Sequence, residues 1–291
     1  MKSKNKKIFA GVISLGIIAA VAIGGTLSYL TDSTEQRANN FTFASNGIDA
    51  MLTEPDWDGV IDYLYPDDPD FPEGSNADIV PVYGYNEDGK PITEQPNDIV
   101  YGEDNAKNMI PGQTAKKNPI ITNTGTMTDE WVAAKVTFVY GEGSSNAGKA
   151  LNEADWALVK EYIQVDYNTA ESDNGYWTQV GAAETVSQTY YYSEILNKGT
   201  ETNGKVTYGE VTQPIFNTVT LSTEADNETV EKLIKMGGIA IYIEGYAVQS
   251  DAYSDYAAWM ASNSAVFEHT PTTGYAPDTG VASPGIFPKS A

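Results

Sequence analysis

Cysteine is absent from the 291 residues, and histidine occurs once, as His269. Without cysteine, the chain forms no disulfide, thiol nucleophile, thiolate metal site or iron–sulfur cluster. A single histidine excludes zinc sites built on two or more histidines, including the H-E-x-x-H motif of metalloproteases. The motifs of α/β-hydrolases, P-loop proteins and dinucleotide-binding proteins are also missing. The sequence therefore predicts a protein that is not an enzyme and has no cofactor.

Basic residues are scarce, since 17 Lys and Arg stand against 40 Asp and Glu, for a net charge of −23. Such a chain repels phosphate backbones and anionic membrane surfaces, so nucleic acid is excluded as a partner. It attracts cations or a basic partner, and self-repulsion keeps it soluble. The simpler interpretation is that the acids only solvate the surface.

The first residues have the pattern of an export signal. Four lysines lie before residue 8, and residues 8–30 are uncharged and mostly apolar. Small side chains at Thr26 and Ser28 precede a polar segment, so we predict that residues 1–28 are a signal peptide and that Tyr29 begins the mature chain. The alternative is a retained anchor, because about 23 apolar residues can cross a bilayer. Cleavage would remove four lysines and no acid, which leaves a net charge near −27.

The mature region is patterned mostly as β-strands between turn signals. Apolar and polar residues alternate over residues 131–140 and 239–248, which predicts strands with one face in a core. Residues 215–221 and 48–52 mark two further strands. The segment Asn86–Gly89 is typical of a hairpin turn, with Asp-Gly at its centre.

Three short helices are expected between the strands. The first follows Asn152, with Asp155 as its capping-box partner. The second runs from about Asp226 to Met236, and the third starts near Ser250. Strands with a few inserted helices predict a mainly β protein, a jelly-roll-like two-sheet β-sandwich.

We place this sandwich domain at residues 44–268. No lysine or arginine occurs in residues 38–89, which hold twelve acids. This composition marks an acidic surface insertion at about residues 59–105. Residues 269–291 are rich in Pro, Thr and Gly with few core residues, and they predict a disordered tail.

Some of the acids could hold calcium, because hard cations bind clustered carboxylate oxygens. The candidates lie in the insertion and just before it: Asp56, Asp58, Asp67, Asp68 and Asp70. Their spacing is not that of an EF-hand, and solvated loop acids are the alternative.

Aromatic residues offer a second candidate site, since 19 tyrosines and 5 tryptophans could stack on sugars. Trp57, Trp177 and the run Tyr190-Tyr191-Tyr192 are the candidates, and packing within strands is the alternative. A pair of carboxylates could also serve a glycosidase, although 40 acids make any pair plausible.

The N-terminal region carries a family resemblance. Its specific part consists of Gly24-Gly25-Thr26, then Tyr29-Leu30-Thr31-Asp32, then Phe41-Thr42-Phe43-Ala44-Ser45-Asn46-Gly47. Residues 108–125 and 238–251 are similar as well. On these residues the chain resembles the TasA/camelysin family of exported proteins of Gram-positive bacteria.

The resemblance implies a jelly-roll domain, secretion after cleavage by a signal peptidase of the SipW type, and assembly into biofilm matrix fibres. It also implies a donor strand, roughly Tyr29 to Phe43, that pairs with the next subunit by β-strand addition. Phe41 and Phe43 would lie on one face of that strand and make the assembly contact. Camelysin has been classed as a metallopeptidase, an activity for which this chain lacks the histidines.

The expected function is therefore that of a secreted structural protein of the cell surface or extracellular matrix, which self-associates into filaments and meets other matrix proteins. Two alternatives stay open. One is a secreted adhesin that binds sugar or protein through an aromatic surface beside the acidic insertion. The other is a secreted hydrolase, which would need a deep cleft with two converging carboxylates.

Overall fold

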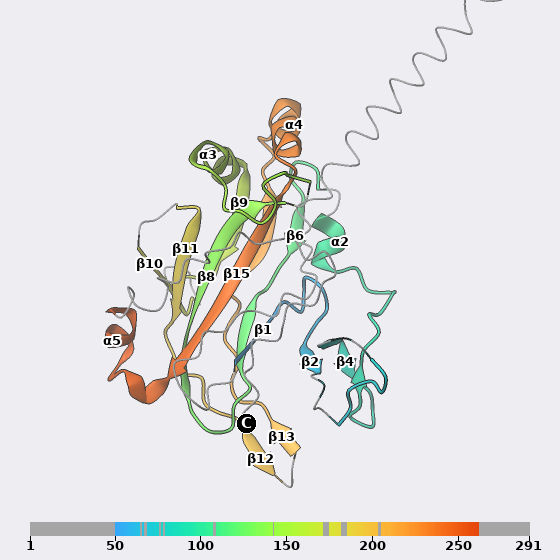
Figure 1. The fold of residues 1–291 in the computed structure, drawn as a ribbon. Coiled ribbons are helices and arrows are strands. Elements are labelled where there is room, and N and C mark those ends of the chain that lie inside the picture. Colours follow the sequence, from blue (N-terminus) through green and yellow to red (C-terminus); the bar gives the residue numbers. More distant parts are fainter. Residues whose placement is uncertain are drawn as a thin grey trace, which may run out of the picture.

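The computed structural model describes residues 50–261, except for residues 65, 67, 68, 76, 78, 107, 108, 142, 171–174, 182–184, 203 and 204. Within these residues the protein is mainly β, with a few short helices (Figure 1). The strands are β1 (Ala50–Thr53), β2 (Asp62–Leu64), β3 (Val80–Val82), β4 (Gly84–Tyr85), β5 (Pro91–Ile92), β6 (Thr114–Lys116), β7 (Ile120–Asn123), β8 (Glu130–Tyr140), β9 (Ile163–Tyr167), β10 (Trp177–Val180), β11 (Ser187–Tyr192), β12 (Thr200–Thr202), β13 (Lys205–Thr207), β14 (Phe216–Leu221) and β15 (Ile239–Gln249). The helical segments are α2 (Gly102–Ala106), α3 (Glu153–Tyr162), α4 (Asn227–Lys235), the 3₁₀ turn η1 (Ser250–Ala252) and α5 (Tyr256–Ala261).

Two layers of strands face each other. One is the four-stranded sheet β10-β11-β8-β15, and the other contains the three-stranded sheet β6-β14-β9. The pair β1–β7 extends the second layer, because the backbone N–H of Thr212 donates to Ile121 at 2.9 Å and that of Ile215 donates to Pro119 at 3.0 Å. These layers confirm the mainly β sandwich that the sequence predicts.

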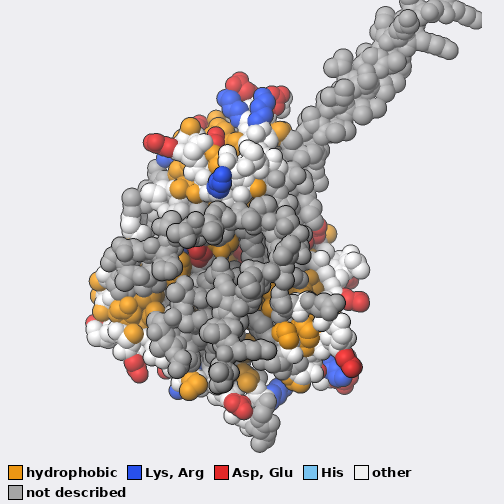
Figure 2. Space-filling model, in the orientation of Figure 1, with side chains coloured by type: hydrophobic (Ala, Val, Ile, Leu, Met, Phe, Trp, Pro, Cys, Tyr) orange, Lys and Arg blue, Asp and Glu red, His pale blue; other side chains and the backbone are white. Residues whose placement is uncertain are grey.

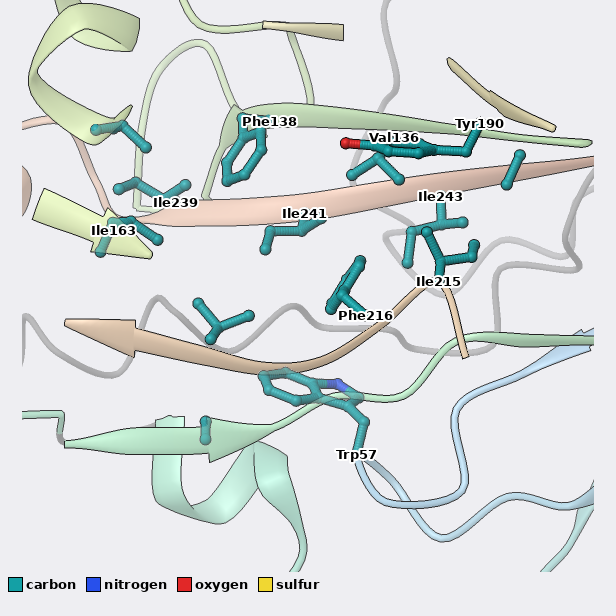
Figure 3. Close-up of a cluster of buried hydrophobic side chains, with 14 of the residues drawn as sticks. Trp57, Val136, Phe138, Ile163, Tyr190, Ile215, Phe216, Ile239, Ile241 and Ile243 are labelled. Atoms are coloured by element: carbon teal, nitrogen blue, oxygen red, sulfur yellow. The ribbon is translucent and has the colours of Figure 1, made fainter. Parts of the chain in front are cut away.

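Alternation places one face of each long strand in the core. Figure 3 shows Val136 and Phe138 of β8, and Ile241 and Ile243 of β15, on the side of the core that faces Phe216 of β14. The register pairs Ile241 with Phe138 and Ile243 with Val136, so both strands present the same face. Each buried side chain of this kind contributes about 1.5–3 kcal/mol. The strand pattern predicted for these two segments is confirmed.

The outer face of the four-stranded sheet carries a smaller apolar cluster under α5. Trp259 packs edge-on against Tyr191 with ring centroids 4.9 Å apart, and Trp131 joins the same cluster. The expectation of one helix from near Ser250 is wrong, because η1 and α5 are separated. Tyr253 has an extended φ of −133°, which interrupts the helical path, and its ring packs on Trp259 instead.

The other two predicted helices are confirmed. The side chain of Asn152 caps α3 by accepting from Asp155 N at 2.9 Å, but the reciprocal capping-box bond is replaced. The Asp155 carboxylate accepts from the Tyr140 hydroxyl at 2.5 Å, and Asn152 N donates to that same hydroxyl at 3.3 Å. Asp226 caps α4, which ends before Gly237 at a φ of 84°.

The acidic stretch at residues 59–105 forms two short hairpins, β2–β3 and β4–β5, followed by α2 beside the sandwich (Figure 1). The predicted turn closes β4–β5, with Gly89 at a φ of 75°. The acidic stretch also has a small apolar cluster of its own, which consists of Leu64, Val80 and Val82, with Phe71 packed against it. The described part of this stretch is therefore built from regular elements with a local core.

Three predicted segments lie outside the described residues: the signal peptide (1–28), the donor segment (29–43) and the C-terminal tail (269–291). Within the part of the chain that the structure describes, no helix is long and apolar enough to cross a membrane.

Candidate functional site: the outer edge of strand β15

The strand β15 ends the four-stranded sheet and pairs with β8 along all of its 11 residues. At the two ends of this ladder, Gly141 N donates to Gly238 O at 3.0 Å and Ser250 N donates to Asp129 O at 2.8 Å. In an antiparallel ladder, residues whose backbone N–H and C=O groups bond to the partner strand alternate with residues whose backbone groups point away from it. The even-numbered residues of β15 therefore bond to β8. The odd-numbered residues direct their N–H and C=O groups to the outer edge.

Among the described strands, none pairs with the outer edge of β15. The strand β1, whose first residue Ala50 begins the described part of the chain, contacts β15 (Figure 1). Ile239, Ile241 and Ile243 are odd-numbered and buried, so the edge borders the core directly. A sheet edge with no paired strand among the described residues, beside an apolar floor, is a template for an added strand.

A small cavity of about 10 Å³ adjoins this edge, with room for about one water molecule. Its wall combines side chains from both layers and from α2, and it is apolar except for one amine. The lining residues are Trp57, Ala106, Met109, Ala115, Lys117, Val219, Ile239 and Ile241.

The amine belongs to a buried ion pair. Lys117 is 2% exposed, and its Nζ lies 2.6 Å from Oε2 of Glu54 and 4.3 Å from the centroid of the Trp57 ring. Oε1 of Glu54 is buried and has no hydrogen-bond partner among the described residues. Burial, and then the charge of Glu54, raise the pKa of Asp58 to about 7, although the backbone N–H of Val60 and the charge of Lys117 act in the opposite direction.

Three of the five acids that the sequence grouped as a calcium candidate lie among the described residues. Asp56 and Asp70 are exposed, whereas Asp58 is half-buried near the ion pair. Asp67 and Asp68 lie outside the described residues. Within the described ranges, no three Asp, Glu or His side chains come together as a metal-binding group.

The aromatic residues proposed to stack on sugars are not at the surface. Trp57, Trp177 and the run Tyr190-Tyr191-Tyr192 are all buried. Tyr190, for example, stacks on Tyr167 with ring centroids 4.9 Å apart. Their role as a surface platform is therefore wrong, and packing within the sandwich is the correct interpretation.

The predicted processing residues Ser28 and Tyr29, and the predicted assembly residues Phe41 and Phe43, lie outside the described residues and stay predictions. Sequence reasoning missed the pair Glu54–Lys117, whose members are 63 positions apart. One signal was present, because strand alternation places Lys117 on the same face as the buried Ala115.

Comparisons with known proteins leave the family unassigned: no protein-family model, curated protein or solved structure matches this chain.

Proposed function

We propose that this chain is a secreted structural protein of the bacterial cell surface or biofilm matrix, and that its copies assemble into fibres by strand donation. The observation that carries the proposal is the outer edge of β15, which offers backbone donors and acceptors to a further strand. The donor is the segment at residues 29–43, which cleavage after Ser28 frees from the membrane. It pairs with the β15 edge of the next copy.

The edge suits a donor with alternating apolar side chains. Phe41 and Phe43 fall on one face of an extended segment, so both point the same way. On the β15 edge that face would meet the seam between the layers, where Ile239 and Ile241 line the cavity. Donation from one copy to the next is a head-to-tail contact. Such a contact does not close on itself and therefore gives filaments.

The same segment has a second acceptor within reach, the β15 edge of its own chain. The strand β1 contacts β15, and Tyr29 lies 21 positions before Ala50, a span of up to about 70 Å when extended. Self-pairing would satisfy the edge and give a monomer. Assembly therefore requires that donation to a neighbour outcompete pairing within the chain.

The experiment compares three purified forms: one that begins at Tyr29, one that lacks residues 29–40, and one with extra residues before Tyr29. We expect filaments only from the first form, by negative-stain microscopy and sedimentation. Adding a peptide of residues 29–43 to the form that lacks residues 29–40 should raise its melting temperature, because a ligand of the native state stabilises it.

If all three forms stay monomeric across concentration and down to pH 4, the fibre proposal gives way to the adhesin. That alternative has one supporting observation. The hydroxyls of Tyr85, in the insertion, and Tyr208, after β13, both donate to buried Asp62, the second at 3.1 Å. The two tyrosine residues remain 50% and 41% exposed, and Figure 2 shows hydrophobic side chains at the surface on this side. They form an anchored aromatic surface beside the acidic stretch.

A further inference from the structure

The ion pair Glu54–Lys117 joins two distant parts of the chain inside the sandwich. Glu54 follows β1, at the start of the described domain, and Lys117 follows β6. The side chains are 7% and 2% exposed, with 2.6 Å between Oε2 and Nζ. A second ion pair in the fold, Lys135–Glu244, is longer at 3.5 Å and more exposed, at 19% and 10%. Among the ion pairs that the structure describes, only Glu54–Lys117 has its charged atoms in direct contact and both side chains almost completely removed from water.

The surroundings of this pair disfavour charge. Lys117 lines an apolar cavity and covers the ring of Trp57, and Oε1 of Glu54 has no hydrogen-bond partner among the described residues. Two buried ions are stable only when hydrogen bonds satisfy their remaining atoms, which is not the case for Oε1. The raised pKa of the nearby Asp58 has the same cause, since burial opposes its ionisation.

We propose that Lys117 and Glu54 condense into an intramolecular isopeptide bond, an amide between Nζ and Cδ that ties the end of β1 to the end of β6. A proton first passes from the ammonium to the carboxylate along their existing hydrogen bond. The neutral amine then attacks Cδ, the Nζ–Cδ bond forms, and a Cδ–O bond breaks. The departing oxygen leaves as water with the second amine proton, so the ion pair loses one water molecule and no other reactant is needed.

Two features of the site favour this condensation. Reactants held in contact behave as if present at about 10⁵–10⁸ M, which compensates for the slow reaction of a free amine with a free carboxylic acid. The apolar lining favours the neutral amide over two buried ions and disfavours the return of water. The product amide keeps one oxygen and carries no charge, so the site no longer holds a charged oxygen without a hydrogen bond. In a chain without cysteine, it supplies a covalent link that no disulfide can provide.

Mass spectrometry of the folded full-length protein tests the proposal. We expect an intact mass below that of the sequence by one water molecule. A tryptic digest should contain residues 38–107 joined to residues 117–135, because trypsin does not cleave after a lysine in amide linkage. Recovery of residues 118–135 as a free peptide from all molecules, after prolonged incubation at neutral pH, would overturn the proposal whatever the variants do.

The variants locate the bond. Lys117→Arg keeps the positive charge but removes the primary amine, and Glu54→Ala removes the acyl carbon, so both should show the unmodified mass. Lys135→Met alters the more exposed pair and should keep the loss of water. Circular dichroism establishes that each variant is folded. Loss of water that persists in folded Lys117→Arg or Glu54→Ala protein would place the modification elsewhere and contradict this assignment.

Discussion

At the scale of single residues, the acids near β1 differ by environment more than by spacing. Asp56 and Asp58 are two positions apart and looked equivalent as calcium ligands. In the fold, Asp56 is exposed, whereas Asp58 lies near Glu54 and Lys117. The sequence could not separate them, because the groups that act on Asp58 include Lys117, which follows β6 and is distant in the sequence.

The raised pKa of Asp58 predicts a pH dependence of stability. The pKa is about 7 in the folded protein and near 3.9 when unfolded, so the folded state binds the proton more tightly. This contribution is fully present below about pH 4 and is lost as pH rises through about 7. Because Asp58 is only half-buried, we expect the loss between pH 5 and pH 8 to be about 1–2 kcal/mol after allowance for solvent screening.

Urea unfolding at pH 5 and pH 8, followed by tryptophan fluorescence, measures this change in the free energy of unfolding. Asp58→Asn keeps an acceptor for the backbone N–H of Val60 but cannot titrate, so its pH dependence should be smaller than that of the parent protein by this amount. Asp56→Asn changes an exposed neighbour and serves as the control. An Asp58→Asn variant with the parent pH dependence would contradict this account.

At the scale of elements, periodicity predicted the long strands and the capped helices. The strands β8 and β15 alternate over many residues, and α3 and α4 begin at Asn152 and Asp226 with cap bonds that the sequence signals. The pairings between strands could not be predicted in the same way. The pair β1–β7 joins residues about 70 positions apart, and the outer edge of β15 follows from which strands lie beside it.

The alternation of backbone groups along β15 predicts opposite effects for proline at two alanines. The N–H of Ala247 faces the outer edge, whereas that of Ala240 faces β8. Ala247→Pro removes a donor from the edge only, where proline is tolerated. We therefore expect a folded monomer that no longer forms filaments. Ala240→Pro removes a ladder bond and should destabilise the protein by about 3 kcal/mol or more.

Thermal melting and negative-stain microscopy of both variants check this difference. The comparison is matched, because both substitutions introduce proline for alanine in the same strand. Filaments from Ala247→Pro that resemble those of the parent protein would show that the β15 edge does not take part in assembly. A large loss of stability in Ala247→Pro alone would instead contradict the assignment of its N–H to the outer edge.

At the scale of the whole molecule, strand patterning predicted the mainly β class and composition predicted the acidic character, but neither predicted the assembly state. A net charge of −23 makes two copies repel each other, and cleavage of residues 1–28 would increase this repulsion by removing four lysines. Strand donation must overcome the repulsion at each junction. Assembly should therefore depend on ionic strength and on pH, whereas the fold of one copy should depend on them less.

This repulsion gives a prediction for salts. Raising NaCl from about 0.05 to about 0.5 M shortens the screening length severalfold. We expect the concentration of protein needed for filaments to fall about tenfold or more, and to fall again toward the pI of 4.2. Calcium and magnesium at equal concentration should act alike, because the described residues hold no cluster of acids that would favour one ion.

Sedimentation of protein that begins at Tyr29, measured across these salts, checks the prediction. Filaments that form equally well at low salt would show that repulsion does not limit assembly. A clearly larger effect of calcium would instead point to a specific site, with Asp67 and Asp68 the first residues to substitute.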